Sequence, residues 1–128
     1  MPATRIETRR GWIKNRKIEI IEAVQDALVS ALKLPERDRC VRLLEYDEDA
    51  IITPQGKGPF YTVIEVTLFS GRTIDAKRNL YTALTDRLFP FGIPATDVKI
   101  VLVEVPASNW GLGGVPASEI ELGYKIDV

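Results

Sequence analysis

The sequence predicts a two-layer α+β fold (one α layer on one β layer), in which a tandem βαβ repeat forms a four-stranded mixed sheet with two helices on one face. In each half of the chain, two β-rich runs flank a helical pattern. From the end of each helical pattern onward the halves coincide at an offset of 59, as a duplicated unit would. Right-handed βαβ connections then place both helices on the same face. The coinciding pairs are Leu34 with Ile93, Pro35 with Pro94, Asp38 with Asp97, Val41 with Ile100, Leu43 with Leu102, and Glu45 with Glu104.

In the first half we predict a strand over residues 2–8, a helix over about 15–33 and a strand over 40–46. Apolar residues at steps of three and four indicate the helix, because this spacing lines one helical face. Pro35 ends the helix, and the run CVRLLEY that follows it favours a strand. The apolar residues of the helical pattern are Ile18, Ile21, Val24, Leu28, Ala31 and Leu32.

The second half repeats this order. The run FYTVIEVTLF predicts a strand over 60–69, since β-branched and aromatic residues favour strands. Thr73 can cap the helix that follows, and a strand over 98–105 closes the unit. The predicted packing face of this helix consists of Lys77, Leu80, Tyr81, Leu84, Leu88 and Phe91.

These elements make one domain over residues 1–128, with pseudo-repeats over about 1–50 and 60–106. Residues 107–128 are predicted to be a C-terminal oligomerisation segment, whose apolar end over 123–128 could pair with a neighbour's sheet edge. Since both helices cover one face of the sheet, the other face, rich in Val, Ile and Leu, is too apolar to stay exposed. We therefore expect identical subunits to bury it.

Composition excludes several classes of protein. With 17 Lys and Arg, 18 Asp and Glu and 45% apolar residues in 128, the chain has a net charge of −1 and is not disordered. Basic residues near the N-terminus are not interleaved with aromatic residues, so no nucleic-acid partner is expected. The sequence has no apolar stretch of membrane-spanning length and no signal pattern, so we expect no membrane partner and a cytoplasmic location. The basic residues are Arg5, Arg9, Arg10, Lys14, Arg16 and Lys17.

The chain contains no His and a single cysteine, Cys40. This excludes Ser-His-Asp and Cys-His catalysis and Cys/His zinc sites. No compact acidic motif suggests a Mg²⁺ site, and we expect neither a metal nor a cofactor. Catalysis would have to use carboxylates, Arg, Lys, Tyr or a chain terminus.

Pro2 directly follows Met1, and a small residue at this position usually permits removal of the methionine. A free proline would be a secondary amine at the start of a strand. With its neutral form favoured by nearby Arg charges, it could accept and return a proton near pH 7. The alternative is that Pro2 is incidental, and its nitrogen remains an amide if Met1 persists.

Three further residues stand at strand ends or in loops. Arg72 lies in the turn SGRT, where βα units place anion-binding groups, and an Arg there can hold a carboxylate by two hydrogen bonds; the alternative is a solvated loop residue. Asp38 lies before the strand over 40–46, and its repeat partner Asp97 supports the alternative of a turn or capping role. Trp110, among glycines, could wall an apolar pocket or pack under a loop.

Taken together, Pro2, the duplicated βαβ unit and the segments PERDR (35–39), FSGRT (69–73) and NWGLGG (109–114) resemble the tautomerase superfamily. This superfamily has the fold of 4-oxalocrotonate tautomerase and macrophage migration inhibitory factor. The resemblance covers essentially the whole chain and is closest to members like malonate semialdehyde decarboxylase. It implies a homotrimer whose bare sheet faces line a central barrel.

The resemblance also implies roles for residues. Pro2 would be the general acid or base, Arg72 would bind and polarise a carboxylate or carbonyl, and Asp38 would assist the chemistry. Trp110 matches a pocket tryptophan and, with Ser70, is a candidate substrate-binding residue. Ser70 stands where the decarboxylase has the first arginine of an Arg-x-Arg pair, which leaves one carboxylate clamp fewer. A histidine-dependent dehalogenase of the cis type is disfavoured.

Three functions are consistent with these observations. The first is a cofactor-free, homotrimeric tautomerase, an isomerase acting on a small α-keto or enol carboxylic acid. The second is decarboxylation or hydration of a small β-carbonyl or unsaturated acid, as the PERDR segment suggests. The third is a trimeric binding module that kept the fold without the chemistry, for which a retained Met1 would be the sign.

Overall fold

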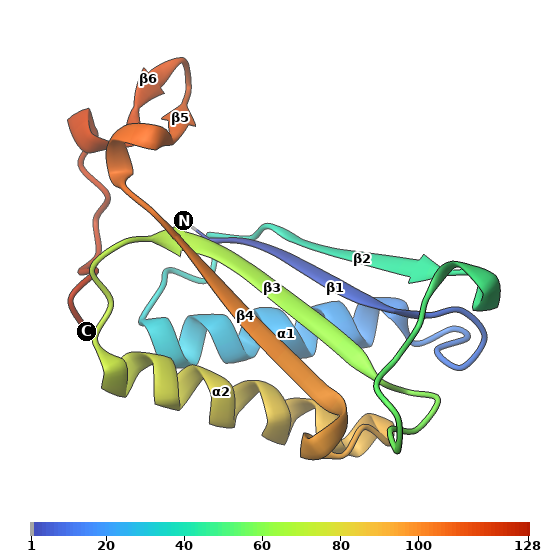
Figure 1. The fold of residues 1–128 in the computed structure, drawn as a ribbon. Helices are drawn as coiled ribbons and strands as arrows, with labels where there is room; N and C mark the ends of the chain where they lie inside the picture. The colour runs from blue at the N-terminus through green and yellow to red at the C-terminus, as the bar shows by residue number, and fades with distance from the viewer. Residues whose placement is uncertain (1) are drawn as a thin grey trace.

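Strand β1 lies at the centre of a four-stranded sheet in the computed structural model, which describes residues 2–128. The sheet has the order β2-β1-β3-β4, and two helices, α1 and α2, pack side by side across one of its faces (Figure 1). This confirms the predicted two-layer α+β fold. The elements are β1 (Ala3–Arg9), α1 (Lys17–Leu32), β2 (Val41–Tyr46), β3 (Thr62–Phe69), α2 (Ile74–Leu88) and β4 (Val98–Val105).

The strand pairing brings four strand ends to one edge of the sheet. Strand β1 runs parallel to β2 and antiparallel to β3, and β3 runs parallel to β4. In this register Thr4 lies opposite Val41, Ala3 opposite Thr67, and β3 and β4 end together. The start of β1, the start of β2, and the ends of β3 and β4 therefore lie together, and we call this edge the site end.

Local hydrogen bonds define the start of α2 and the end of α1. The Thr73 hydroxyl caps α2 by accepting a hydrogen bond from the Ala76 N–H at 3.1 Å, as predicted. Helix α1 ends at Leu32, where Lys33 takes a left-handed conformation and donates its N–H to the Val29 carbonyl. The helix thus stops before Pro35, and each element whose bounds were predicted agrees with the structure within two residues. The packing face predicted for the second helix ran to Phe91, whereas α2 ends at Leu88.

The core lies between the helices and the sheet, and the buried residues of each helix recur at four-residue steps. In α1 the series starts at Ile20, which is 1% exposed, whereas Ile18 is 74% exposed. Two residues advance a helix by more than half a turn, so Ile18 points away from the core. In α2, Tyr81 is exposed and Ala76 is buried instead. The prediction that Ile18 and Tyr81 face the core is therefore wrong.

The uncovered face of the sheet is apolar only in part. Leu44 on β2 and Val101 and Val103 on β4 are exposed there. Strands β1 and β3 instead carry charged side chains, and the guanidinium of Arg5 lies 2.7 Å from the Glu65 carboxylate. The Glu7 carboxylate lies 3.6 Å from the same guanidinium and accepts a hydrogen bond from the Tyr46 hydroxyl, which raises the Tyr46 pKa. A charged strip thus separates two borders that carry exposed apolar side chains, whereas the sequence predicted a face rich in Val, Ile and Leu.

The chain beyond β4 extends past the site end and then returns (Figure 1). Strands β5 (Gly111–Leu112) and β6 (Val115–Pro116) form a small hairpin, and the last residues run back to the turn before α2. Within residues 2–128, neither α1 nor α2 has the length and apolar character needed to cross a membrane. Short 3-10 turns are Glu48–Ala50, Phe89–Phe91, Ala95–Asp97, Ala107–Asn109 and Ala117–Glu119.

We expect Ile20→Ala to lower the free energy of unfolding by about 2–5 kcal/mol, because it removes buried methyl groups and leaves a cavity. Ile18→Ala is the matched control in the same helix, and it should change the value by less than about 0.5 kcal/mol. Urea unfolding followed by circular dichroism measures both. Equal losses in the two variants would contradict the packing described for α1.

Candidate active site

All five residues singled out in the sequence lie at the site end of the sheet. Pro2 is buried and directly precedes β1, and Asp38 lies before the start of β2. Ser70 and Arg72 follow the end of β3, and Trp110 follows the end of β4. The register of the four strands therefore gathers residues that are up to 108 positions apart in the sequence (Pro2 and Trp110).

Arg72 is buried, at 8% exposure, although it lies in a turn. Its Nη1 donates a hydrogen bond of 2.7 Å to the Leu32 carbonyl, one of the carbonyls that the end of α1 leaves without a helical partner. Among the described residues its Nε is buried and has no hydrogen-bond partner. Burial lowers the pKa of Arg72, and the guanidinium nevertheless stays charged. The prediction of a solvated loop arginine is thereby excluded.

Asp38 and its repeat partner Asp97 have different surroundings. The Asp97 carboxylate accepts a hydrogen bond of 3.0 Å from the Gly58 N–H, and so ties the segment between the two halves to the start of β4. Asp38, which is also buried, lines a cavity of about 400 Å³. Asp97 thus has a structural role, of the kind that the sequence left as the alternative for Asp38, while Asp38 faces a space that a small molecule could enter.

The cavity lies between the loop before β2 and the returning C-terminal segment. Its charged side chains are those of Arg37, Asp38 and Glu121, and its other walls are mostly apolar. A mostly apolar cleft with a few polar groups is the usual form of a small-molecule site. The remaining lining residues are Pro35, Leu112, Ile120, Leu122 and Tyr124.

Trp110 and Ser70 are joined through one backbone carbonyl. The indole Nε1 of Trp110 and the backbone N–H of Ser70 both donate to the Val105 oxygen, each at 3.1 Å. The Trp110 ring also packs on Phe69, with 4.9 Å between ring centroids. Trp110 lies outside the lining of the cavity beside Asp38, so of its two predicted roles the structure supports packing against the end of β3.

Tyr124 also lies at the site, although no feature of the sequence predicts it. Its ring lies over the guanidinium of Arg72, with the Arg72 Cζ 6.0 Å from the ring centroid, and it lines the same cavity as Asp38. Burial, and then the charge of Asp38, raises the Tyr124 pKa to about 12, while Arg72 acts in the opposite direction. A lone aromatic residue in the run GYKIDV carries no spacing or motif that would have pointed to this contact.

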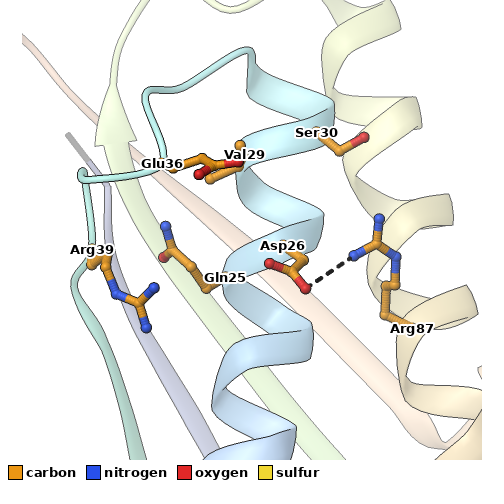
Figure 2. Close-up of a pocket in the computed structure, with 7 residues that line it drawn as sticks. All are labelled: Gln25, Asp26, Val29, Ser30, Glu36, Arg39 and Arg87. Atoms are coloured by element: carbon orange, nitrogen blue, oxygen red, sulfur yellow. Dashed lines mark ion pairs between the residues drawn. The ribbon is translucent and has the colours of Figure 1, made fainter.

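A second hollow, of about 370 Å³, lies on the outer side of α1 (Figure 2). Its charged groups are largely paired, since Arg87 lies 3.7 Å from Asp26 and Arg39 pairs with Glu22. Gln25 at its inner wall is buried and donates its side-chain N–H to the Asp38 carbonyl at 3.0 Å. In the part of the chain that the structure describes, none of the five predicted site residues lines this hollow. Gln25 nevertheless holds the backbone of Asp38, which is one of the five.

The arrangement at the site end can bind a small anion and move a proton. Arg72, which is not among the residues that line the cavity, supplies a buried guanidinium whose Nε has no hydrogen-bond partner among the described residues. Asp38 supplies a carboxylate beside the partly apolar cavity. Charge that develops on a substrate oxygen in such surroundings is stabilised more strongly than in water. Within residues 2–128, no group of three or more His, Cys, Asp or Glu is arranged to hold a metal ion.

The chain is similar to known proteins, and a family model covers the part of the site that lies within residues 38–113. A family model described as "Tautomerase enzyme" matches residues 38–113. A "Probable tautomerase" of Ralstonia nicotianae is 44% identical over 57 residues, which cover 44% of this chain and 81% of that protein.

Two solved structures are also similar. A malonate semialdehyde decarboxylase inhibited by 3-bromopropiolate is 33% identical, with a TM-score of 0.79 and coverage of 87% of this chain and 88% of that one. A fused 4-OT described as a symmetric trimer is 25% identical, with a TM-score of 0.80 and coverage of 91% and 96%. Because the family model spans more than half of the chain and the Ralstonia relative is matched over most of its length, the chain belongs to the tautomerase family of enzymes.

Proposed function

We propose that the protein is a keto–enol tautomerase that acts on a small α-keto or enol carboxylic acid, with Pro2 as the general acid and base. The observation that carries this proposal is the buried guanidinium of Arg72, with its Nε unpartnered among the described residues, at the same sheet edge as Pro2. A buried charge is costly unless it is paired. The carboxylate of a substrate would supply the missing partner.

Pro2 is positioned for proton transfer by its place before β1. Pro2 is buried, and burial disfavours the charged form of an amine. A neutral secondary amine can take the proton from the enol oxygen and return it to carbon, so that substrate and product are isomers and the amine is regenerated. Arg72 holds the substrate carboxylate and stabilises the charge on the intermediate enolate. This step requires that Met1 be removed.

The size of the cavity beside Asp38 supports a small substrate. At about 400 Å³ it lies at the lower end of the usual range for ligand sites. Arg37 supplies a cationic side chain to its lining, and apolar residues form much of the remaining wall. Ser70 and Trp110, which share the Val105 carbonyl, support the turn that carries Arg72.

We expect Pro2→Ala to reduce the rate of ketonisation of phenylenolpyruvate by about 10²–10⁴-fold, the usual contribution of general acid–base catalysis. The rate is measured by stopped-flow mixing with detection of ultraviolet absorbance. Pro90→Ala is the control, because Pro90 is an exposed proline just beyond the distal end of α2. An unchanged rate in Pro2→Ala would refute the role of Pro2.

The intact mass of untagged protein tests the same proposal independently. A mass one methionine below that of the full sequence is expected, because only then is the Pro2 nitrogen an amine. The full mass would leave an amide at Pro2, and the site would then be limited to binding.

Decarboxylation of a small β-carbonyl acid is the second candidate. It is favoured by the 33% identity to a malonate semialdehyde decarboxylase and by the contrast between Asp38, which lines the cavity, and Asp97, which is structural. In this reaction the bond to the carboxylate breaks and carbon dioxide leaves. The resulting enolate receives a proton from the protonated amine of Pro2, which then regains a proton from water. Ser70 supplies no second cation at the turn, which favours tautomerisation over this alternative.

If decarboxylation occurs, release of carbon dioxide from malonate semialdehyde should fall by at least about 10²-fold in Asp38→Asn, which removes the carboxylate but preserves shape. Asp97→Asn is the matched control from the second repeat, and in folded protein it should retain the activity. No release of carbon dioxide at high enzyme concentration would exclude the second candidate.

We also propose that three copies of the chain assemble through the uncovered face of the sheet, as the fused 4-OT trimer suggests. The exposed side chains of Leu44, Val101 and Val103 provide apolar borders for the contact. The charged strip formed by Arg5, Glu7 and Glu65 would then lie between these borders, where Arg5 offsets part of the charge of the two carboxylates.

Sedimentation equilibrium should give a mass three times the 14.3 kDa of the chain. Val103→Asp should shift the mass toward that of the monomer, because a carboxylate would be buried without a partner. Ile18→Asp places the same charge on the outer side of α1 and should leave the assembly intact. A monomeric wild-type protein would contradict the proposed assembly.

A further inference from the structure

The C-terminal segment crosses the turn that carries Arg72. Ile126 packs on Gly71, where its Cγ2 lies 3.3 Å from the position that a Cβ would occupy. Two residues earlier, the Tyr124 ring lies over the Arg72 guanidinium. Gly71 has a φ of +118°, so both its conformation and its contact with Ile126 favour glycine here. The segment is thus seated on the turn at two adjacent points.

The Arg72 guanidinium is held from two elements that are distant in the sequence. The Leu32 carbonyl at the end of α1 accepts from Nη1, and the Tyr124 ring contributes a cation–π contact. The ring also shields Arg72 from solvent, which agrees with its low exposure. The contact with Leu32 uses Nη1, and the Nε–H has no partner among residues 2–128. The guanidinium is therefore held in place but keeps one unused hydrogen-bond donor.

The chemistry of the Tyr124 side chain suits this position. Its pKa of about 12 keeps the phenol neutral at physiological pH, although Asp38 and Arg72 act on it from opposite directions. A neutral ring can contact Arg72 without neutralising its charge, whereas a carboxylate in its place would compete with a substrate. The same ring lines the cavity beside Asp38, so it connects the arginine to the space where a substrate would bind.

We propose that Tyr124 is a positioning residue that, through its aromatic ring, holds Arg72 ready for the carboxylate of the substrate. The proposal rests on the proposed role of Arg72 as the carboxylate-binding group. It assigns the effect to the ring and not to the hydroxyl. The C-terminal segment therefore contributes to substrate recognition in addition to any part in assembly.

The test compares Tyr124→Phe, which keeps the ring, with Tyr124→Leu, which removes it. Ketonisation is measured with phenylenolpyruvate and with its uncharged methyl ester. We expect Tyr124→Leu to raise KM for the acid by about 2- to 30-fold, with a smaller effect on kcat, and to leave the ester unaffected. Tyr124→Phe should behave as wild type. Tyr81→Leu, at an exposed tyrosine of α2, is the matched control.

Two outcomes of this assay overturn the inference. Equal selectivity for acid over ester in wild type and folded Tyr124→Leu would show that the ring does not position Arg72. A defect in Tyr124→Phe as large as that in Tyr124→Leu would assign the effect to the hydroxyl. If Arg72→Leu kept the wild-type selectivity for the acid over the ester, the proposed function would be contradicted, because the carboxylate would then bind elsewhere.

A second measurement does not depend on activity. Modification of arginine by phenylglyoxal, followed by peptide mass spectrometry, reports the accessibility of each guanidinium. Arg72 should react slowly in wild type and Tyr124→Phe and several-fold faster in Tyr124→Leu, while the exposed Arg78 should react equally in all three. Equal reaction of Arg72 in all three proteins would overturn the inference even if the protein proved to have no tautomerase activity.

Discussion

The structure depends on the antiparallel pairing of β1 with β3, which joins the two βαβ halves at the centre of the sheet. Within each half the strands are parallel, so their starts lie together and their ends lie together. Antiparallel pairing then sets the start of the first half against the end of the second. Pro2 and the loop carrying Asp38 thereby meet the turn carrying Arg72. A parallel junction would have separated these groups by the length of a strand.

The duplicated βαβ unit accounts for the fold, and differences between its two copies account for features of the site. The repeats keep matching ion pairs, because Lys17 with Glu45 and Lys77 with Glu104 join the start of each helix to the strand that follows it. The aspartates before those strands have diverged in environment. The Asp97 carboxylate accepts a hydrogen bond from the Gly58 N–H, whereas Asp38 lines a cavity that the returning C-terminal segment helps to close.

The buried cation of Arg72 links the stability of the structure to its proposed chemistry. The Leu32 carbonyl and the Tyr124 ring offset part of the cost of burying it, and each comes from a different region of the chain. The end of α1, the turn before α2 and the C-terminal segment are consequently coupled at one side chain. In the proposed function, a substrate carboxylate would complete this set of contacts.

The sequence by itself determined the elements and their order, because helical spacing, the Thr73 cap and the repeat offset are local or periodic signals. It also indicated Pro2, Asp38 and Arg72 as candidates, Pro2 because it follows Met1 and the other two because each lies beside a predicted strand. Only the tertiary structure separated Asp38 from Asp97, which the sequence treats as equivalent, and only it placed Tyr124 on Arg72. It also revealed the charged strip on the uncovered face, where Arg5 meets Glu65. These features depend on contacts between residues far apart in the chain, and such contacts leave no periodic trace in the sequence.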